Sequence, residues 1–417
     1  MPQPGGAGLH ESMGGRLFER TLIGRSRPSS PDLFCCVHRA GACWAHAAIL
    51  HKGASSMKNT TRNALLRTAA AAAMLLPLAA ASTSAGAVSW TVYASGFNDP
   101  RGLKFGPDGH LYVAEGGMGG TNSTVGQCTQ VPPPPGPGPV TGSPTGGRIS
   151  KVVNGTRVTV TDQFPSDMTN AQTGSGISGV ADIAFVGDTL YALTAAGGCS
   201  HGVAGTSNGV FRVSATGHIT EIANLSAFQM ANPTAVVRPS DFEPDGTWYS
   251  MVAVRGALYA VEPNHGELDR ISTGGSISRV ADISASQGHI VPTAVAFHGN
   301  FYVGNLSTFP ITGDSKILKI TPDGYVKPVA WGLSTVLGVA FDNRDRMYVL
   351  ENTVGAPGPT PGDGDIIRID PNGKETIILS GLHLPTAITM GPDGALYVSD
   401  WGIGPPGLGR ILRVTGL

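Results

Sequence analysis

The sequence predicts an all-β fold, a six-bladed β-propeller, for residues 88–417 of this 417-residue chain. Three observations support this prediction: a segment that recurs six times, an alternating strand pattern after each copy, and no convincing amphipathic helix after residue 88. Repeats of about 40–50 residues that contain several short strands are typical of propeller blades. We therefore expect residues 88–417 to form one continuous domain.

Each copy of the repeated segment contains a short apolar run, a turn, and a strand centred on a tyrosine. The six tyrosines are Tyr112, Tyr191, Tyr259, Tyr302, Tyr348 and Tyr397. The last three intervals between them are 43, 46 and 49 residues, which is the length of one four-stranded blade. The first two intervals are 79 and 68 residues, because insertions interrupt the first two copies.

A second hairpin with apolar residues at every other position follows each copy, as in residues 316–321, KILKIT. This alternation is typical of strands that are buried on one face. The sixth copy ends at Leu417 one strand short, and residues 89–94, SWTVYA, match an outer strand. We expect this N-terminal strand to complete the C-terminal blade, which leaves no open sheet edge.

The composition excludes several classes of protein and ligand. Gly and Pro make up about a fifth of the chain and charged residues 14%, which excludes collagen, a coiled coil and a disordered polyanion. Residues 1–87 hold nine Lys and Arg against three Asp and Glu, so residues 88–417 hold 19 against 26 and carry a net charge of −7. This negative charge repels phosphate, so we expect no nucleic-acid partner.

Residues 57–87 are interpreted as a cleaved signal peptide. Basic residues precede an apolar run that ends near Ala81, and small residues follow at 85–87. The run is shorter than the roughly 20 residues that span a bilayer, so we expect a secreted or periplasmic protein with no membrane insertion in its mature form. Residues 1–56 are either untranslated sequence before the true start at Met57 or a disordered extension.

Two cysteines, Cys128 and Cys199, remain after residue 87. They lie in the insertions 116–147 and 195–208, which occupy the same place in neighbouring blades and so share one face. An even number of cysteines in an exported protein permits a disulfide. We predict a Cys128–Cys199 bond, with two unpaired thiols as the alternative.

Two stretches, residues 242–271 and 291–320, resemble the ScyD/ScyE family of secreted bacterial β-propellers. The resemblance extends over essentially all of residues 88–417, and the GPDGxLYV blades at both ends agree with it. It also relates the chain to NHL-like and gluconolactonase-like six-bladed propellers. The resemblance implies the fold and export, but it implies no reaction, since none is established for the family.

A column of polar residues lies three positions after the repeated tyrosines. Its members are Glu115, Thr194, Glu262, Asn305, Glu351 and Asp400. Oxygen ligands at one blade position could surround a cation such as Ca²⁺. The alternative is structural: such side chains cap the following loop or pair with third-strand arginines, namely Arg148, Arg212, Arg270, Arg368 and Arg410.

A second column tests the chain for enzymatic activity. The residues expected just before the inner strands are Arg101, Ala181, Thr234, Thr293, Leu337 and Thr386. None is a carboxylate or an amide, and the nearest acid is Asp182. A metal-activated water needs several oxygen ligands around one ion, so this column argues against lactonase or phosphotriesterase activity.

The sequence therefore favours an exported, non-catalytic propeller that binds a small molecule, glycan or protein on its loop-rich face. The candidate ligand-binding residues are Glu115, Glu262, Asn305, Glu351, Asp400, Arg101 and His265. His265 shares a loop with Glu262 and Glu267, although a hydrogen-bonded turn would also explain it. We expect a monomer without a cofactor, Ca²⁺ being the one ion considered.

Two enzymatic alternatives stay open. One is a calcium-dependent hydrolase or lactonase of the six-bladed class. The other is a quinone-dependent sugar dehydrogenase, which is suggested only by residues 102–115 of the first blade.

Overall fold

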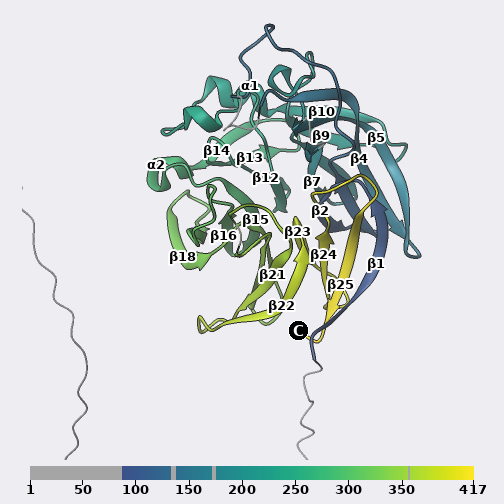
Figure 1. Ribbon diagram of the computed structural model, residues 1–417, viewed down its shortest axis with the longest axis vertical. Helices are drawn as coiled ribbons and strands as arrows, with labels where there is room; N and C mark the ends of the chain where they lie inside the picture. The colour runs from purple at the N-terminus through teal and green to yellow at the C-terminus, as the bar shows by residue number, and fades with distance from the viewer. Residues whose placement is uncertain (1–86, 133–137, 171–174, 356) are drawn as a thin grey trace, which may run out of the picture. The chain divides into compact units, whose positions relative to one another are not determined.

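The computed structural model describes residues 87–132, 138–170, 175–355 and 357–417, which form a six-bladed β-propeller. The predicted fold class is confirmed. Figure 1 shows the inner strands of the blades, such as β2, β7, β15 and β23, gathered near the centre of the ring. Apart from Ala87, the predicted extension and signal peptide lie outside the described residues.

The blades follow one another along the chain, each as an antiparallel sheet. Blade one contains β2 (Pro100–Phe105), β3 (Leu111–Glu115), β4 (Thr141–Val153), β5 (Thr156–Asn170) and β6 (Ser175–Ser178). Blade two contains β7 (Val180–Val186), β8 (Thr189–Thr194), β9 (Gly209–Val213) and β10 (Ile219–Asn224). Blade three contains β11 (Ser250–Val254), β12 (Ala257–Glu262), β13 (Glu267–Ser272) and β14 (Ile277–Asp282).

The second half of the ring has the same organisation. Blade four contains β15 (Pro292–His298), β16 (Asn300–Asn305), β17 (Ser315–Ile320) and β18 (Val326–Leu333). Blade five contains β19 (Val336–Phe341), β20 (Met347–Glu351), β21 (Pro361–Ile369) and β22 (Glu375–His383). Blade six contains β23 (Ala387–Met390), β24 (Leu396–Asp400) and β25 (Gly409–Thr415), completed by β1 (Ser89–Phe97).

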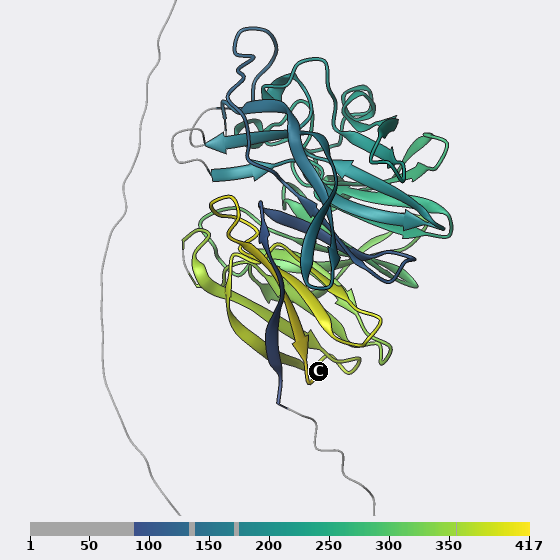
Figure 2. The same cartoon turned by 90° about the vertical axis from the view of Figure 1, so that its right-hand side faces the viewer.

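The two ends of the propeller are joined as the sequence predicts. Strand β1 pairs antiparallel with β25, from Ser89 opposite Thr415 to Phe97 opposite Gly409. Figure 2 shows the dark blue β1 beside the yellow C-terminal strands. Because this pairing supplies the missing outer strand, the sixth blade has four strands, as blades two to five have.

The repeated tyrosines have a structural role in three of the hairpins. The tyrosine hydroxyl donates to an aspartate in the turn just before it, from Tyr112 to Asp108 (2.9 Å) and from Tyr397 to Asp393 (3.1 Å). Tyr348 makes the same contact with Asp342 (3.0 Å). The repeat therefore combines a turn acid with a strand tyrosine that binds it.

The hydrophobic core lies between neighbouring blades, where both faces of each sheet are covered. Val261 and Leu268 of blade three, for example, pack with Phe301 and Leu318 of blade four. Each of these side chains is at most 1% exposed. Burial of such side chains is worth about 1.5–3 kcal/mol each, so face-to-face blade packing supplies much of the stability.

Two short helices, which the sequence analysis did not predict, connect blades. They are α1 (Leu225–Ala231), after β10, and α2 (Ile283–Gln287), after β14. Asn224 and Asp282 cap them by accepting hydrogen bonds from Ala227 N and Ala285 N. At seven and five residues, they are too short to show a helical apolar period. Within the described ranges, no helix has the length and apolarity required to cross a membrane.

Candidate functional site

The predicted column of polar residues is buried where the second strands end. Glu351 is 4% exposed and the other five members are 0% exposed. In five blades the side chain binds the main chain of the segment just before the first strand of the same blade; in blade six this residue, His383, is the last of β22. These hydrogen bonds are Asn98 N to Glu115 Oε2 (2.7 Å), Thr247 N to Glu262 Oε1 (2.9 Å), Asn305 Nδ2 to Ile290 O (2.8 Å), Ser334 N to Glu351 Oε1 (2.5 Å) and His383 N to Asp400 Oδ1 (2.6 Å).

Other polar atoms of the column also bind within their own blades. Glu262 Oε2 accepts from His265 N (2.6 Å), and Asn305 Oδ1 accepts from Lys316 N (2.7 Å). Thr194 differs, because its hydroxyl exchanges hydrogen bonds with the main chain of Gly209. The structural alternative therefore accounts for the column, since loop capping occupies these polar atoms.

Pairing with third-strand arginines occurs in only one of the described blades. Arg410 Nε donates to Asp400 Oδ2 (2.7 Å). Arg368 pairs instead with Asp370 (2.9 Å), while Glu115 pairs with Arg157 of β5 (3.1 Å). Strand alternation determines which face an arginine occupies, but the sequence does not specify how far its long side chain reaches.

Replacement of Glu262 by alanine is expected to reduce stability. The change leaves the amides of Thr247 and His265 without their acceptor, at a cost of about 3 kcal/mol. Urea unfolding of Glu262→Ala measures this loss, with Asp188→Ala at an exposed turn as the control. Unchanged stability together with lost ligand binding would contradict the structural role.

The predicted residue Arg101 lies near the axis of the ring. Its Nη2 donates to the carbonyl oxygen of Ile177 (2.6 Å), and its guanidinium carbon lies 5.9 Å from the centre of the Tyr249 ring. The Tyr249 hydroxyl donates to the carbonyl oxygen of Thr386, the residue just before the first strand of blade six (3.0 Å). Tyr249 thus reaches from blade three to blade six, on the face where the first strands begin.

The prediction that Thr234 directly precedes an inner strand is wrong. Strand β11 begins at Ser250, so Tyr249 holds that position. Residues 233–236, PTAV, are identical to residues 292–295 at the start of β15. The same four residues lie in a loop in one place and in a strand in the other, because the surrounding contacts differ.

Asp182, the acid nearest to the second predicted column, lines a cavity of about 30 Å³ together with other first-strand residues. Its Oδ2 accepts from Met251 N (2.8 Å) and Ser250 Oγ (3.1 Å). Burial raises the pKa of Asp182, and the charge of Lys104 partly opposes this shift. A Cβ atom on Gly102 would lie 1.9 Å from Asp182 Oδ1, so this position requires glycine.

A larger cavity, of about 490 Å³, opens between the loops of blades three and four. We call it the loop cavity. Five serine and threonine side chains, the amide of Asn264 and two aromatic rings line it, together with Arg238, Asp241 and Glu243. The aromatic residues are Tyr249 and Phe309, and Phe309 is 48% exposed. This size and mixture of apolar and polar groups are typical of a small-molecule site.

Two strained residues help to form the wall of the loop cavity. Val291 has φ 57° and Ser307 has φ 66°, values that non-glycine residues rarely adopt. Leu306 N donates to Val291 O (2.8 Å) and Ser307 N donates to Ile290 O (3.0 Å), which ties the two segments together. A positive φ also occurs shortly before the first strands of three other blades, at Asp99, Thr335 and Leu384. The positive φ of Val291 is therefore a feature of the blade repeat.

The charged groups of the loop cavity differ in their surroundings. Asp241 Oδ2 accepts from His289 Nε2 (2.8 Å) and is 30% exposed. Burial raises the pKa of Glu243 to about 8; His201 opposes this shift, while the carboxylates of Glu262, Asp241 and Asp167 add to it. Shifted carboxyl groups in cavities are frequent at functional sites.

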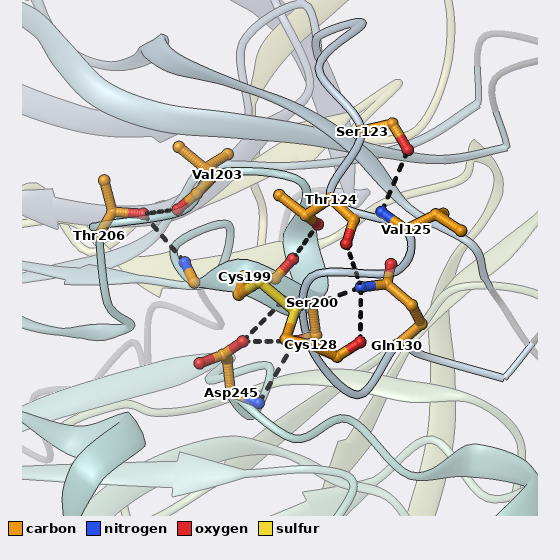
Figure 3. The surroundings of a disulfide bond; sticks show 11 residues. Ser123, Thr124, Val125, Cys128, Gln130, Cys199, Ser200, Val203, Thr206 and Asp245 are labelled. Carbon is orange, nitrogen blue, oxygen red and sulfur yellow. Dashed lines mark hydrogen bonds between the residues drawn. A yellow bond between two sulfur atoms is a disulfide. The ribbon is translucent and has the colours of Figure 1, made fainter. Parts of the chain in front are cut away.

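The predicted pair Cys128 and Cys199 is bonded, with the Cα atoms 6.3 Å apart. Figure 3 shows the bond between the insertion of blade one and the loop of blade two. Next to Cys199, Ser200 binds Asp245 Oδ2 through its N (2.8 Å) and Oγ (2.6 Å). The disulfide therefore braces the loop that carries Asp245 and, two residues earlier, Glu243.

A second open cavity, of about 540 Å³, lies on the blade-one insertion. Met118, Met168 and a run of glycines, hydroxyls and one amide line it, and none of its described lining residues is charged. The loop cavity combines more kinds of chemistry, so we regard it as the candidate functional site.

The structure does not bring the seven predicted ligand-binding residues together. Three of them adjoin the loop cavity without lining it: His265 donates from Nε2 to Glu243 O (3.1 Å), Glu262 binds Thr247 N, and Arg101 lies against Tyr249. The others lie in separate blades. Among the described residues, no group of three or more His, Cys, Asp or Glu is placed to hold a metal ion.

Most of the residues that line the loop cavity were missed by the sequence analysis. Glu243 stands beside Pro244-Asp245-Gly246, which the sequence marks simply as a turn. The one available signal was the long segment 232–249 between two repeated units. Its length indicates an insertion but does not show which side chains meet.

Comparisons with known proteins support the fold alone. No protein-family model matches the chain, and no curated protein sequence matches it. A protein of unknown function from Bacteroides thetaiotaomicron is 12% identical, with a TM-score of 0.51 over 79% of this chain and 76% of that one. A putative oxidoreductase (glucose dehydrogenase) from Thermus thermophilus is 18% identical, with a TM-score of 0.49 over 78% of this chain and 99% of that one.

A gluconolactonase from Xanthomonas campestris is 10% identical, with a TM-score of 0.47 over 79% of this chain and 90% of that one. These structural neighbours include gluconolactonase-like six-bladed propellers. At such low identity, they carry no activity over to this chain.

Proposed function

We propose that this chain is an exported, non-catalytic propeller of the ScyD/ScyE type that binds a small polyhydroxylated molecule, such as a sugar, in the loop cavity. The observation that carries the proposal is the lining of that cavity. Serine and threonine side chains, Asn264 and Arg238 bring polar groups to a wall that also carries two aromatic rings. The hydroxyls of Thr293 and Tyr249 already donate within the protein, to Val336 O and Thr386 O, so the other polar groups are the ones available to a ligand. Sugars have both many hydroxyls and apolar ring faces, so this lining suits them.

The size of the loop cavity fits a small ligand, and its charge favours a neutral one. Its volume of about 490 Å³ lies within the range of small-molecule pockets and accommodates a ligand of one or two sugar rings. The lining carries one arginine, the His289-paired Asp241, and Glu243, whose pKa of about 8 leaves it mostly protonated at pH 7. These charges nearly cancel, so a strongly charged ligand would gain little.

The calcium-dependent hydrolase is the alternative. A metal-bound water requires several ligands around one ion, and the described part of the chain offers no such group. The carboxylates of the second-strand column bind their own loops instead. These residues do not fit a calcium centre, so we derive no catalytic step through calcium.

Export and the family assignment belong to the same proposal. They depend on the signal sequence at 57–87 and on the resemblance of residues 242–271 and 291–320. The disulfide between Cys128 and Cys199 is consistent with an oxidising compartment. We expect a secreted or periplasmic monomer.

Isothermal titration of the processed protein with glucose, maltose, cellobiose and N,N′-diacetylchitobiose tests the proposal. We expect at least one sugar to bind, and Phe309→Ala to weaken its binding about three- to tenfold, because an exposed ring contact is lost. Trp331→Ala removes another exposed ring, which lies on β18, and serves as the control. Binding that requires added Ca²⁺, or that ignores Phe309→Ala, would contradict the proposal.

A further inference from the structure

The carboxyl group of Glu243 has an unusual position in the loop cavity. The residue is 7% exposed and is one of those that line the cavity. Its main-chain carbonyl is occupied by Gly246 N (2.9 Å) and His265 Nε2 (3.1 Å). Its carboxyl oxygens, however, have no hydrogen-bond partner among the described residues.

The nearest cation does not supply that hydrogen bond. His201 Nε2 lies 3.9 Å from Glu243 Oε2, which is too far for a hydrogen bond. Both ring nitrogens of His201 have other partners: Nδ1 lies 2.5 Å from Asp167 Oδ2, and Nε2 lies 3.0 Å from Gly246 O. The imidazole is therefore held away from Glu243 by its own hydrogen bonds.

Charged groups surround Glu243 on several elements. Asp167 of β5, Glu262 of β12 and Asp241 of the same loop are acidic, whereas His201 is the facing base. Burial raises the pKa of Glu243 to about 8, His201 lowers it, and the three carboxylates raise it further. At neutral pH the group is mostly an uncharged acid, and so it can donate a hydrogen bond.

We propose that Glu243 binds the ligand of the loop cavity by donating its carboxyl proton to a neutral oxygen of that ligand. The inference rests on the proposed function and specifies one of its contacts. Glu243 lines an open cavity, so an acceptor atom of a ligand can take this hydrogen bond in place of water. The site is therefore selective for ligands that carry an acceptor there.

Titration of the processed protein with the same four sugars at pH 6.5 and pH 9.0 tests this contact. At pH 9.0 about a tenth of Glu243 retains its proton, so the affinity of the bound sugar is expected to fall about tenfold. Near-UV circular dichroism at both pH values verifies that the protein is folded. Calorimetry at pH 8 in two buffers of different ionisation enthalpy is expected to show uptake of about half a proton.

Glu243→Gln is the decisive variant, because the amide keeps a donor that does not ionise in this range. Its sugar affinity is expected to be equal at the two pH values, whereas Asp188→Asn, at an exposed turn, retains the tenfold change. His201 is intact in both variants, so its own titration cannot produce the difference.

Three outcomes would overturn the inference: an affinity that does not change with pH, one that rises with pH as an ion pair requires, or an unchanged pH dependence in Glu243→Gln. Each presupposes that a sugar binds. If none of the four sugars binds at either pH, the proposed function fails, and the role of Glu243 fails with it.

Discussion

Unfolding of the propeller is expected to require less urea at pH 9 than at pH 6. Burial raises the pKa of Glu267 to about 9, of Glu351 to about 8 and of Asp269 to about 7. His201 also has a raised pKa, of about 9: burial lowers it, but the hydrogen bond and charge of Asp167 outweigh burial. All of these shifts are upward.

The direction of the pH effect follows from these shifts. A group with a raised pKa in the folded state binds protons more tightly there, so its contribution is complete below its unfolded pKa and is lost as pH rises through its folded pKa. For the carboxyl groups this interval begins near pH 4, and for His201 it begins near pH 6.5. Each group contributes up to about 1.4 kcal/mol per pH unit within its interval, so we expect a loss of several kcal/mol by pH 9.

Asp269→Asn tests the origin of this pH dependence. Asp269 is 0% exposed, and neither carboxyl oxygen has a hydrogen-bond partner in the described structure. The amide avoids the buried charge, so the variant is expected to be more stable than the wild type by about 2 kcal/mol at pH 9 and by much less at pH 5. A stability difference that is the same at both pH values would contradict this explanation.

Removal of the disulfide is expected to have the second large effect. The double variant Cys128→Ser/Cys199→Ser frees two residues that are 71 positions apart. Loss of a cross-link of this length typically costs about 2–4 kcal/mol, because the unfolded chain gains conformational freedom. For a domain of this size we expect calorimetry to show a Tm about 4 °C lower.

The same variant also tests whether the disulfide supports the loop cavity. Ser200 follows Cys199 and binds Asp245, and His201 faces Glu243. We therefore expect sugar binding to weaken as well as stability. Wild-type protein treated with dithiothreitol should behave like the variant, and an unchanged Tm in both would contradict the bond's contribution.

The sequence predicted the fold well because blades repeat. Six copies of a turn followed by a tyrosine-containing strand predict the same local structure. One ambiguous copy therefore does not change the predicted fold. The closure by β1 was also predictable, since the last copy lacked one strand and residues 89–94 had the pattern to supply it. Pairing of strands depends on alternation and edge protection, which are visible in the chain.

The candidate site was less predictable, and the errors have a common cause. Glu262 was recognised as one of a column, but whether such a carboxylate binds a ligand or the Thr247 amide depends on where the leading loop passes. Thr234 was misplaced because its neighbours repeat the sequence of a true strand start. In both cases the local pattern was correct and the three-dimensional surroundings were missing.

By itself, the sequence determined the six blades, their closure by the N-terminal strand and the position of the two cysteines, because each depends on local periodicity or on counting. Only the tertiary structure decided that the acidic column caps loops, that Tyr249 reaches across the axis, and that Glu243 lines a cavity while its carboxyl group has no hydrogen-bond partner in the described part of the chain. Those properties arise where loops of different blades meet, and the burial and charge of a side chain are set there by neighbours far away in the sequence.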